Sequence, residues 1–192
     1  MIVYIHGFNS TSASHKAAQV RARLAQEGRV HQFCAPDLPP EPAAAMALLD
    51  ALVAGQKAAG VTLVGSSLGG FYATALSEKL GVRSVLVNPA IDPHVGLAPY
   101  LGPQRNLYSG AEYVLTTDHL EELRQFYVPQ LTHLERYLLI VCSGDEVLDC
   151  RRAVARYRGA RQIVVQGGDH GFGDFDRWLD PVWEFAGLGA PG

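Results

Sequence analysis

The sequence predicts one α/β domain built on a mostly parallel sheet of about six or seven strands, with helices on both faces. The chain has 192 residues, which is enough for one domain with a substantial core. Short runs rich in Val, Ile, Leu and Tyr alternate with helical patterns, as they do in βαβ units. These runs are continuously apolar rather than alternating, which is typical of strands that helices cover on both faces.

The predicted elements follow one another along most of the chain. Strands are expected at Ile2–Ile5, Val30–Cys34, Val61–Val64, Ser84–Val87, Leu138–Cys142 and Gln162–Val165. Helices are expected at Ser14–Gln26, Pro42–Ala59, Leu68–Leu80, Asp149–Arg156 and Asp174–Phe185. Since no repeat, low-complexity tract or long linker divides the chain, residues 1–192 are expected to form a single domain.

One stretch, residues 92–136, does not follow the alternation. Its aromatic and polar residues are mixed, and no clear strand begins or ends it. We interpret it as a short helical insertion between two strands, packed over the carboxyl edge of the sheet. Ligands of open parallel sheets bind beyond that edge, so the insertion is predicted to lie over the active site.

The loop after Val61–Val64 carries the most informative motif. A Gly-Ser-Ser-Leu-Gly run occupies positions 65–69 and leads at once into a helix. This is the G-x-S-x-G pattern of a nucleophile elbow, whose central residue sits in a strained turn between small neighbours. Gly65 and Gly69 stand two positions from Ser67 and do not flank Ser66 in the same way. The pattern therefore predicts Ser67 as a nucleophile.

A serine nucleophile needs a base, and the base needs an acid that orients it. Of the seven histidines, His170 lies after the last predicted strand with glycines on both sides, and it is the predicted base. The acid is expected between serine and histidine along the chain. Asp145 is the first acidic residue after Leu138–Cys142 and is the predicted acid. Glu146 and Asp149 are the alternatives, of which Asp149 is expected to cap the next helix.

The oxyanion of an acyl-transfer intermediate needs backbone N–H donors. One donor is expected from Leu68, the residue after the nucleophile, and the other from Phe8 in the loop after the first strand. Gly7 permits that loop to approach the serine closely. His6 is interpreted as a structural residue that holds the turn, not as a second base.

Three further residues are predicted to contact the substrate. Asn9 borders the same pocket as Phe8. Leu101 and Tyr108 belong to the insertion, whose apolar side chains are expected to wall an acyl pocket and limit acyl length.

Composition gives no sign of a nucleic-acid or membrane partner. The net charge is −3, and no apolar run approaches the roughly 20 residues of a membrane span. Arginines between positions 151 and 161 are interpreted as a solvated helix face. The absence of a secretory signal favours a cytoplasmic location. The three cysteines, Cys34, Cys142 and Cys150, lack metal-like spacing, and the first two are expected in the core; no metal, cofactor or disulfide is expected.

Taken together, these segments resemble the YqiA-type esterases, a group of small bacterial α/β-hydrolase proteins. The resemblance implies a trimmed α/β-hydrolase fold and a carboxylic-ester hydrolase with a Ser67, Asp145 and His170 triad and no cofactor. Asp169 stands where similar sequences can carry Asn, which leaves the pH optimum open. The matching segments are Tyr4–Ser10, Val64–Thr74, Val87–Ala90, Asn106–Leu115, Gly144–Asp149 and Gly167–His170.

The predicted function is hydrolysis of a small acyl ester, or of an acyl thioester by the same route, through a covalent acyl-enzyme. Cleavage of amide or C–C bonds and a non-catalytic binding role on the same fold are the alternatives. A missing triad member would favour the binding role, and none is missing. The physiological substrate, the acyl chain length and the oligomeric state stay open.

Overall fold

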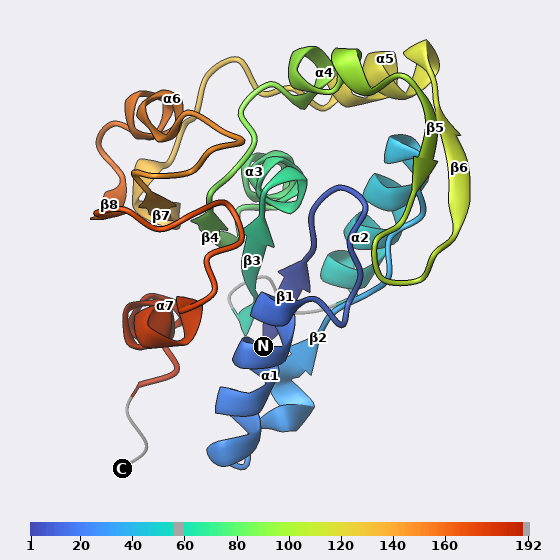
Figure 1. The fold of residues 1–192 in the computed structure, drawn as a ribbon. Coiled ribbons are helices and arrows are strands. Elements are labelled where there is room, and N and C mark those ends of the chain that lie inside the picture. The colour runs from blue at the N-terminus through green and yellow to red at the C-terminus, as the bar shows by residue number, and fades with distance from the viewer. Residues whose placement is uncertain (56–59, 190–192) are drawn as a thin grey trace.

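The computed structural model describes residues 1–55 and 60–189. Within them, six strands form one parallel sheet in the order β2-β1-β3-β4-β7-β8 (Figure 1). This confirms the predicted α/β fold. The strands are β1 Ile2–Ile5, β2 Phe33–Cys34, β3 Thr62–Ser66, β4 Arg83–Val87, β7 Tyr137–Cys142 and β8 Arg161–Val165.

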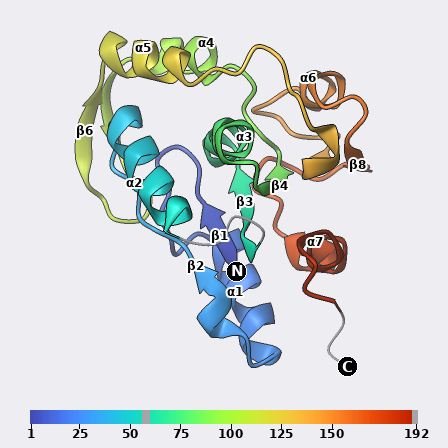
Figure 2. The same cartoon turned by 180° about the vertical axis from the view of Figure 1, so that it is seen from behind.

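Helices cover both faces of the sheet, as Figures 1 and 2 show from opposite sides. The helices α1 and α7 pack on one face, and α2, α3 and α6 on the other. The predicted helix Pro42–Ala59 ends earlier, at Ala54, and positions 56–59 lie outside the described residues. The bounds are α1 His15–Gln26, α2 Pro42–Ala54, α3 Leu68–Leu80, α6 Cys150–Arg156 and α7 Leu179–Ala186, the last preceded by the 3₁₀ turn η5 Phe175–Trp178.

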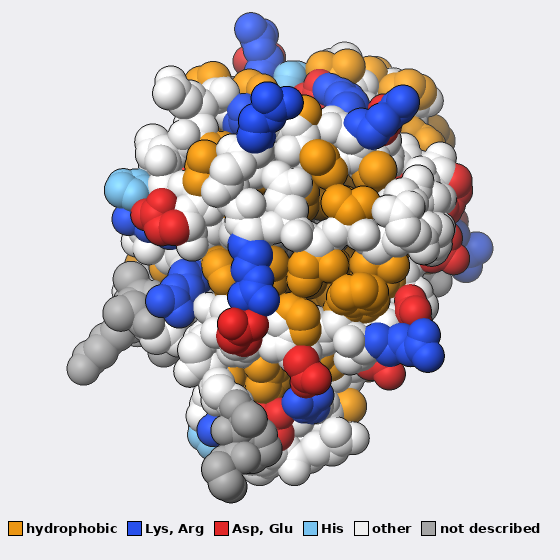
Figure 3. All heavy atoms as spheres, turned by 90° about the vertical axis from the view of Figure 1, so that its left-hand side faces the viewer, with side chains coloured by type: hydrophobic (Ala, Val, Ile, Leu, Met, Phe, Trp, Pro, Cys, Tyr) orange, Lys and Arg blue, Asp and Glu red, His pale blue; other side chains and the backbone are white. Residues whose placement is uncertain are grey.

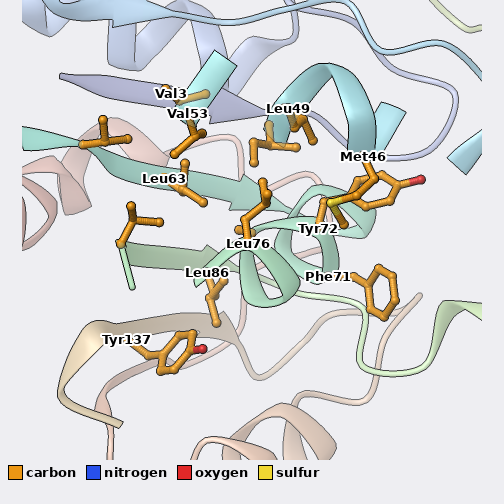
Figure 4. Packing of buried hydrophobic residues seen from close by; sticks show 14 of the residues in the cluster. Val3, Met46, Leu49, Val53, Leu63, Phe71, Tyr72, Leu76, Leu86 and Tyr137 are labelled. Carbon is orange, nitrogen blue, oxygen red and sulfur yellow. The ribbon is translucent and has the colours of Figure 1, made fainter. Parts of the chain in front are cut away.

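The strands divide their side chains between two hydrophobic clusters. Because successive residues of a strand point to opposite faces, a continuously apolar strand contributes to both. Figure 4 shows the cluster on the α2 and α3 side. Burial of each large apolar side chain stabilises the fold by about 1.5–3 kcal/mol. The α2 and α3 side includes Val3, Ile5, Leu63, Leu86, Leu139 and Val141, and the α1 and α7 side includes Ile2, Tyr4, Val64, Val85, Leu138 and Ile140.

The two edges of the sheet differ from the centre. The prediction of a strand at Val30–Cys34 is mostly wrong. Residues 30–32 form a 3₁₀ turn, and only Phe33–Cys34 pair with β1. Val30 is 44% exposed, so an extended strand there would gain little burial. Cys34 is accordingly only half-buried, whereas Cys142 is buried as predicted. At the opposite edge, where β8, α6 and α7 lie, hydrophobic side chains form a patch on the surface (Figure 3).

The insertion between β4 and β7 is helical only in part, which corrects the prediction of a purely helical segment. It contains an antiparallel hairpin, in which Gln104 pairs with Tyr113. In the hairpin turn the side chain of Asn106 accepts the N–H groups of Tyr108 and Ser109, and Gly110 adopts a φ of 73°. Its four-residue strands are too short to give a clear alternating pattern. The elements are α4 Pro93–Gly96, η3 Ala98–Tyr100, β5 Gly102–Arg105, β6 Glu112–Leu115, α5 Thr117–Gln125 and η4 Leu134–Arg136.

The helices α4 and α5 lie beyond α3, and the hairpin lies beside α2 (Figures 1 and 2). The turn of the hairpin reaches the loop that follows β1, where the N–H of Leu107 donates to the carbonyl oxygen of Asn9 at 3.1 Å. The hairpin therefore contacts the loop after β1 at the carboxyl edge of the sheet.

The arginines near α6 are largely exposed and pair with neighbouring groups on the surface, in agreement with their interpretation as a solvated face. Arg151 pairs with Asp149, Arg152 with Asp92 and Arg161 with Glu184, while Arg156 donates to the carbonyl oxygens of Val128 and Pro129. In the two described ranges, no helix combines the length and the apolar character of a membrane span.

Candidate active site

Ser67 lies in the strained turn between β3 and α3. Its φ of 54° and ψ of −122° place a non-glycine residue in a costly region of backbone space. A Cβ atom at Gly65 would collide with the backbone of Gly69, and one at Gly69 would collide with the carbonyl group of Ile5. Only glycine fits both positions, which is the steric reason for the motif.

The turn is fixed to the end of β4 by two backbone bonds. The N–H of Ser67 donates to the carbonyl oxygen of Val87 at 3.1 Å, and its own carbonyl oxygen accepts the N–H of Ala90 at 3.0 Å. The helix α3 begins directly after Ser67, so its positive end faces the space above the hydroxyl.

Three side chains from three loops form a hydrogen-bonded chain. The Nδ1 atom of His170 lies 2.8 Å from Oδ2 of Asp145, and its Nε2 atom lies 3.1 Å from Oγ of Ser67. An ionised carboxylate only accepts, so Nδ1 carries the proton and Nε2 is free to accept from the serine hydroxyl. The side chain of Asp145 is 2% exposed and that of His170 is 21% exposed.

The environment of Asp145 favours its charged form. Burial by itself would raise the pKa of this carboxyl group. The hydrogen bond from His170 and the N–H groups of Leu148 and Val147 outweigh burial, and they hold the pKa below its usual value. Asp145 is thus an ionised acceptor at neutral pH.

The two alternative acids contact other groups. Asp149 caps α6 as expected, since its side chain accepts the N–H of Arg151 at 3.0 Å. Glu146 accepts the backbone N–H of His170 at 3.0 Å and supports the loop rather than the ring. Of the three candidates, Asp145 is the one that contacts the imidazole.

Sequence reasoning missed Asn88, which connects the loops of this site. Its side chain is buried, its Oδ1 accepts the N–H of Cys142 at 2.8 Å, and its Nδ2 donates to the carbonyl oxygens of Asp169 and His170 at 3.2 and 3.4 Å. Asn88 has a φ of 42°, which asparagine tolerates better than most residues. An asparagine directly after a buried strand was the available signal.

A second missed residue, Lys16 of α1, holds the same loop. Its ammonium group donates to the carbonyl oxygen of Gly171 at 2.6 Å. Burial lowers the pKa of Lys16. The loop that carries His170 is therefore tied to α1, β4 and the loop after β7.

Phe8, in the loop after β1, and Leu68, the first residue of α3, line the same cavity. Gly7 passes so close to the serine that a Cβ atom there would lie 3.5 Å from Oγ of Ser67. Among the described residues, no acceptor takes the N–H of Phe8 or of Leu68. Both N–H groups are thus free to bind a ligand, as the predicted oxyanion role requires.

His6 is a structural residue of this loop. Its Nε2 accepts the N–H of Leu38 at 3.0 Å, so the proton is on Nδ1, which lies 2.9 Å from the carbonyl oxygen of Gly7. Burial lowers the pKa of His6, which keeps the ring neutral. The first bond joins the loop after β1 to the segment after β2, and the second holds the turn within that loop.

A cavity of about 300 Å³ opens beside these donors. Phe8, Asn9, Leu68, Tyr72 and Tyr113 are among the residues that line it. Leu101 and Tyr108, which were also predicted to contact substrate, are not among them and are 42% and 54% exposed. Of the three predicted substrate contacts, only Asn9 borders the cavity.

Metal ligation has no candidate in the part of the chain that the structure describes. There, no three or more His, Cys, Asp or Glu side chains are grouped so that they could hold an ion.

The fold and the strained serine turn define the α/β-hydrolase class. A protein from Agrobacterium vitis S4, named only provisionally as a hydrolase, superposes with a TM-score of 0.75 at 19% identity, over 96% of this chain and 87% of that chain. Mouse alpha/beta hydrolase domain-containing protein 10 superposes with a TM-score of 0.68 at 17% identity, over 95% of this chain and 89% of that chain. Est1E from Butyrivibrio proteoclasticus superposes with a TM-score of 0.67 at 14% identity, over 97% of this chain and 85% of that chain.

Within that class, the chain belongs to the uncharacterised protein family UPF0227, which it matches over residues 1–187. The match confirms the predicted resemblance to the YqiA-type proteins. At identities below a fifth, the similar solved structures establish the fold and leave the chemistry to be argued from the site.

Proposed function

We propose that this protein is a serine hydrolase that cleaves carboxylic esters, with Ser67 as nucleophile, His170 as general base and Asp145 as the acid that orients it. The observation that carries the proposal is the continuous hydrogen-bonded chain from Asp145 through His170 to Ser67. A serine hydroxyl within reach of an oriented imidazole is the arrangement that nucleophilic catalysis requires.

In the first half of the reaction, Oγ of Ser67 attacks the ester carbonyl carbon while Nε2 of His170 takes the hydroxyl proton. The N–H groups of Phe8 and Leu68 stabilise the negative charge that develops on the carbonyl oxygen. His170 then gives its proton to the departing alkoxide, so an alcohol leaves and an acyl-serine ester stays.

In the second half, His170 removes a proton from water, and the hydroxide attacks the acyl-serine carbonyl. Ser67 recovers its proton from His170 as the carboxylic acid departs. Asp145 stabilises the imidazolium in both halves without taking its proton.

Ester hydrolysis is favoured over the alternatives by the proteins that share this fold. Est1E is named as an esterase in abbreviated form, and a domain from a Rhodothermus marinus protein is described as an esterase domain. Acyl thioesters would react by the same steps. Amide or C–C cleavage and a purely binding role are less well supported, since the three side chains are intact and connected.

The decisive experiment compares Ser67→Ala with Ser66→Ala. Ser66 is the neighbouring hydroxyl, buried in β3, and serves as the matched control. Ser67→Ala is expected to abolish turnover of p-nitrophenyl acetate and covalent labelling by a fluorophosphonate, a loss of several powers of ten. Ser66→Ala should retain both. Labelling of the Ser67→Ala protein would contradict the proposal.

A further inference from the structure

The position of the cavity relative to the three side chains suggests which part of an ester it receives. In the sheet, β1 and β2 lie on one side of β3, and β4, β7 and β8 lie on the other. Asp145 and His170 come from the β7 and β8 side, whereas Phe8 and Asn9 come from the β1 side. The cavity is lined by Phe8 and Leu68 and not by His170, so an ester with its carbonyl oxygen at those two N–H groups and its leaving oxygen toward His170 would extend its acyl substituent toward the cavity.

The lining of the cavity combines aromatic walls with negative charge. Phe8, Tyr72 and Tyr113 supply aromatic surface, and among the described residues no lysine or arginine lines the cavity. Asp37 and Glu112 also line the cavity. A hydrogen bond from the N–H of Ser12 lowers the pKa of Asp37, so its carboxylate is ionised at neutral pH. A carboxylate on the acyl group would meet repulsion here and find no cation to pair with.

The hairpin is hydrogen-bonded to the side chain of Asn9 in the loop after β1, which is called the oxyanion loop below because it carries Phe8. The hydroxyl of Tyr113 donates to Oδ1 of Asn9 at 2.9 Å, and Nδ2 of Asn9 donates to Oε1 of Gln104 at 3.1 Å. Tyr113 and Gln104 are cross-strand partners in the β5–β6 hairpin. Asn9 itself has a φ of 52°, which asparagine tolerates as Asn88 does, and its side chain then reaches the hairpin.

The backbone of the same loop is bound to the hairpin turn. Besides the bond from Leu107 to Asn9, the side-chain amide of Asn106 donates to the carbonyl oxygen of Ser10 at 2.8 Å. The position of the Phe8 N–H, one residue before Asn9, therefore depends on the hairpin.

Tyr113 both lines the cavity and holds the side chain of Asn9. Its ring lines the cavity and meets the ring of Phe8 edge-on, with centroids 6.5 Å apart. Burial raises the pKa of Tyr113 to about 12, so its hydroxyl remains a donor to Asn9 at any ordinary pH. An acyl group in the cavity would contact the residue that fixes the oxyanion loop.

Building on the proposed esterase function, we propose that this cavity is the binding site for an uncharged acyl group, and that Tyr113 is a positioning residue that holds the oxyanion donor of Phe8 in place through Asn9. The site selects against anionic acyl groups, and the hydroxyl of Tyr113 acts on turnover rather than on affinity.

The acyl preference is tested with two esters that share a leaving group, p-nitrophenyl butyrate and mono-p-nitrophenyl succinate, after correction for their spontaneous hydrolysis. We expect kcat/KM to favour butyrate at least tenfold, and Asp37→Asn to narrow that ratio by raising the succinate value. Equal turnover of the two esters by the wild-type protein, or a ratio that Asp37→Asn leaves unchanged, would overturn the assignment of the site.

The positioning role is tested with Tyr113→Phe, which removes one oxygen atom. We expect kcat for the butyrate ester to fall about 10- to 100-fold, as for a misplaced oxyanion donor, while KM changes less than about threefold. Asn9→Ala should show the same loss of kcat. The kcat of the double variant should be no lower than that of the less active single variant. Val114→Ala, on the other face of β6, is the matched control and should match the wild type in kcat.

Three results would overturn the positioning role: an unchanged kcat in Tyr113→Phe, a change in KM alone, or additive losses in the double variant. Failure of the proposed function looks different, because the wild-type protein would then neither turn over any ester nor accept the fluorophosphonate at Ser67. A protein that labels and turns over esters but shows no acyl discrimination fails this inference alone.

Discussion

The loops that carry Ser67, Asp145 and His170 and the hairpin of the insertion meet at the same site, but they are built differently. The three loops leave the ends of buried parallel strands, and buried or partly buried groups such as Asn88 fix them from below. The hairpin is largely exposed, with Leu107 83% and Tyr108 54% accessible to solvent. It reaches the body of the protein through hydrogen bonds to the loop after β1.

The difference matters for function. Strain such as that at Ser67 persists only where the surrounding packing over-determines the backbone, and the sheet supplies that packing. The hairpin is attached by partly buried hydrogen bonds and few buried side chains, so its exposed positions can change in sequence at a smaller cost in stability. On the proposed function, the catalytic side chains and the hairpin that positions the loop after β1 thus lie in different parts of the molecule, and variants in the two parts should behave differently.

The largest effect is expected at the sheet end of the site. Asp145→Asn should lower kcat for an acyl ester by about 10⁴-fold with the fold retained, because an amide cannot stabilise the imidazolium and favours the wrong tautomer of His170. Asp149→Asn is the matched control and should cost little beyond a weakened helix cap. If Asp149→Asn were the crippling change in steady-state kinetics, the acid would be misassigned.

Asn88→Asp should produce an intermediate effect. A carboxylate keeps the acceptor for Cys142 but turns an oxygen, in place of an N–H donor, toward the carbonyl oxygens of Asp169 and His170. We expect kcat to fall about 10- to 100-fold through a displaced His170 loop, and the free energy of unfolding to fall by about 1–3 kcal/mol. Kinetics and chemical denaturation measure the two losses. Wild-type kcat in this variant would show that the loop is positioned without Asn88.

A smaller, pH-dependent effect is expected at His6. Because the folded state lowers its pKa, the neutral ring contributes stability that is fully present above the unfolded pKa of about 6.5 and is lost as the pH falls toward the folded value. The loss approaches about 1.4 kcal/mol for each unit of difference between the two pKa values. The charge of Asp37 opposes it.

Urea denaturation between pH 7.5 and 5.5 measures this loss. The variant His6→Gln cannot titrate at this position, so its stability should fall less steeply over the same range. Parallel curves for the two proteins would show that other groups carry the pH dependence.

The smallest effects are expected on the outside of the insertion. Leu101→Ala and Tyr108→Ala remove exposed side chains that do not line the cavity, so kcat/KM across a graded series of p-nitrophenyl esters should stay within about threefold of the wild type. A shift of the preferred acyl length in one variant would show that its residue does contact the acyl group, as the sequence predicts.

Particular residues show how far the sequence alone could go. The glycines around Ser67 predict a strained turn because the collision they avoid is local. The order of Ser67, Asp145 and His170 predicts a common edge because parallel strands all end on one side. The strand expected at Val30–Cys34 was mostly wrong, since an edge strand gains little burial. The hairpin was missed because two four-residue strands show almost no period.

What the sequence determined by itself is therefore the parallel α/β architecture and the three side chains that meet at Ser67, since both follow from local sterics and from the periodicity of buried strands. Only the tertiary structure decided what surrounds them. Asn88, Lys16 and the Asn9–Tyr113 contact join residues that lie far apart in the chain. No spacing encodes such contacts, because they exist only after the strands have aligned and the hairpin has docked on the loop after β1.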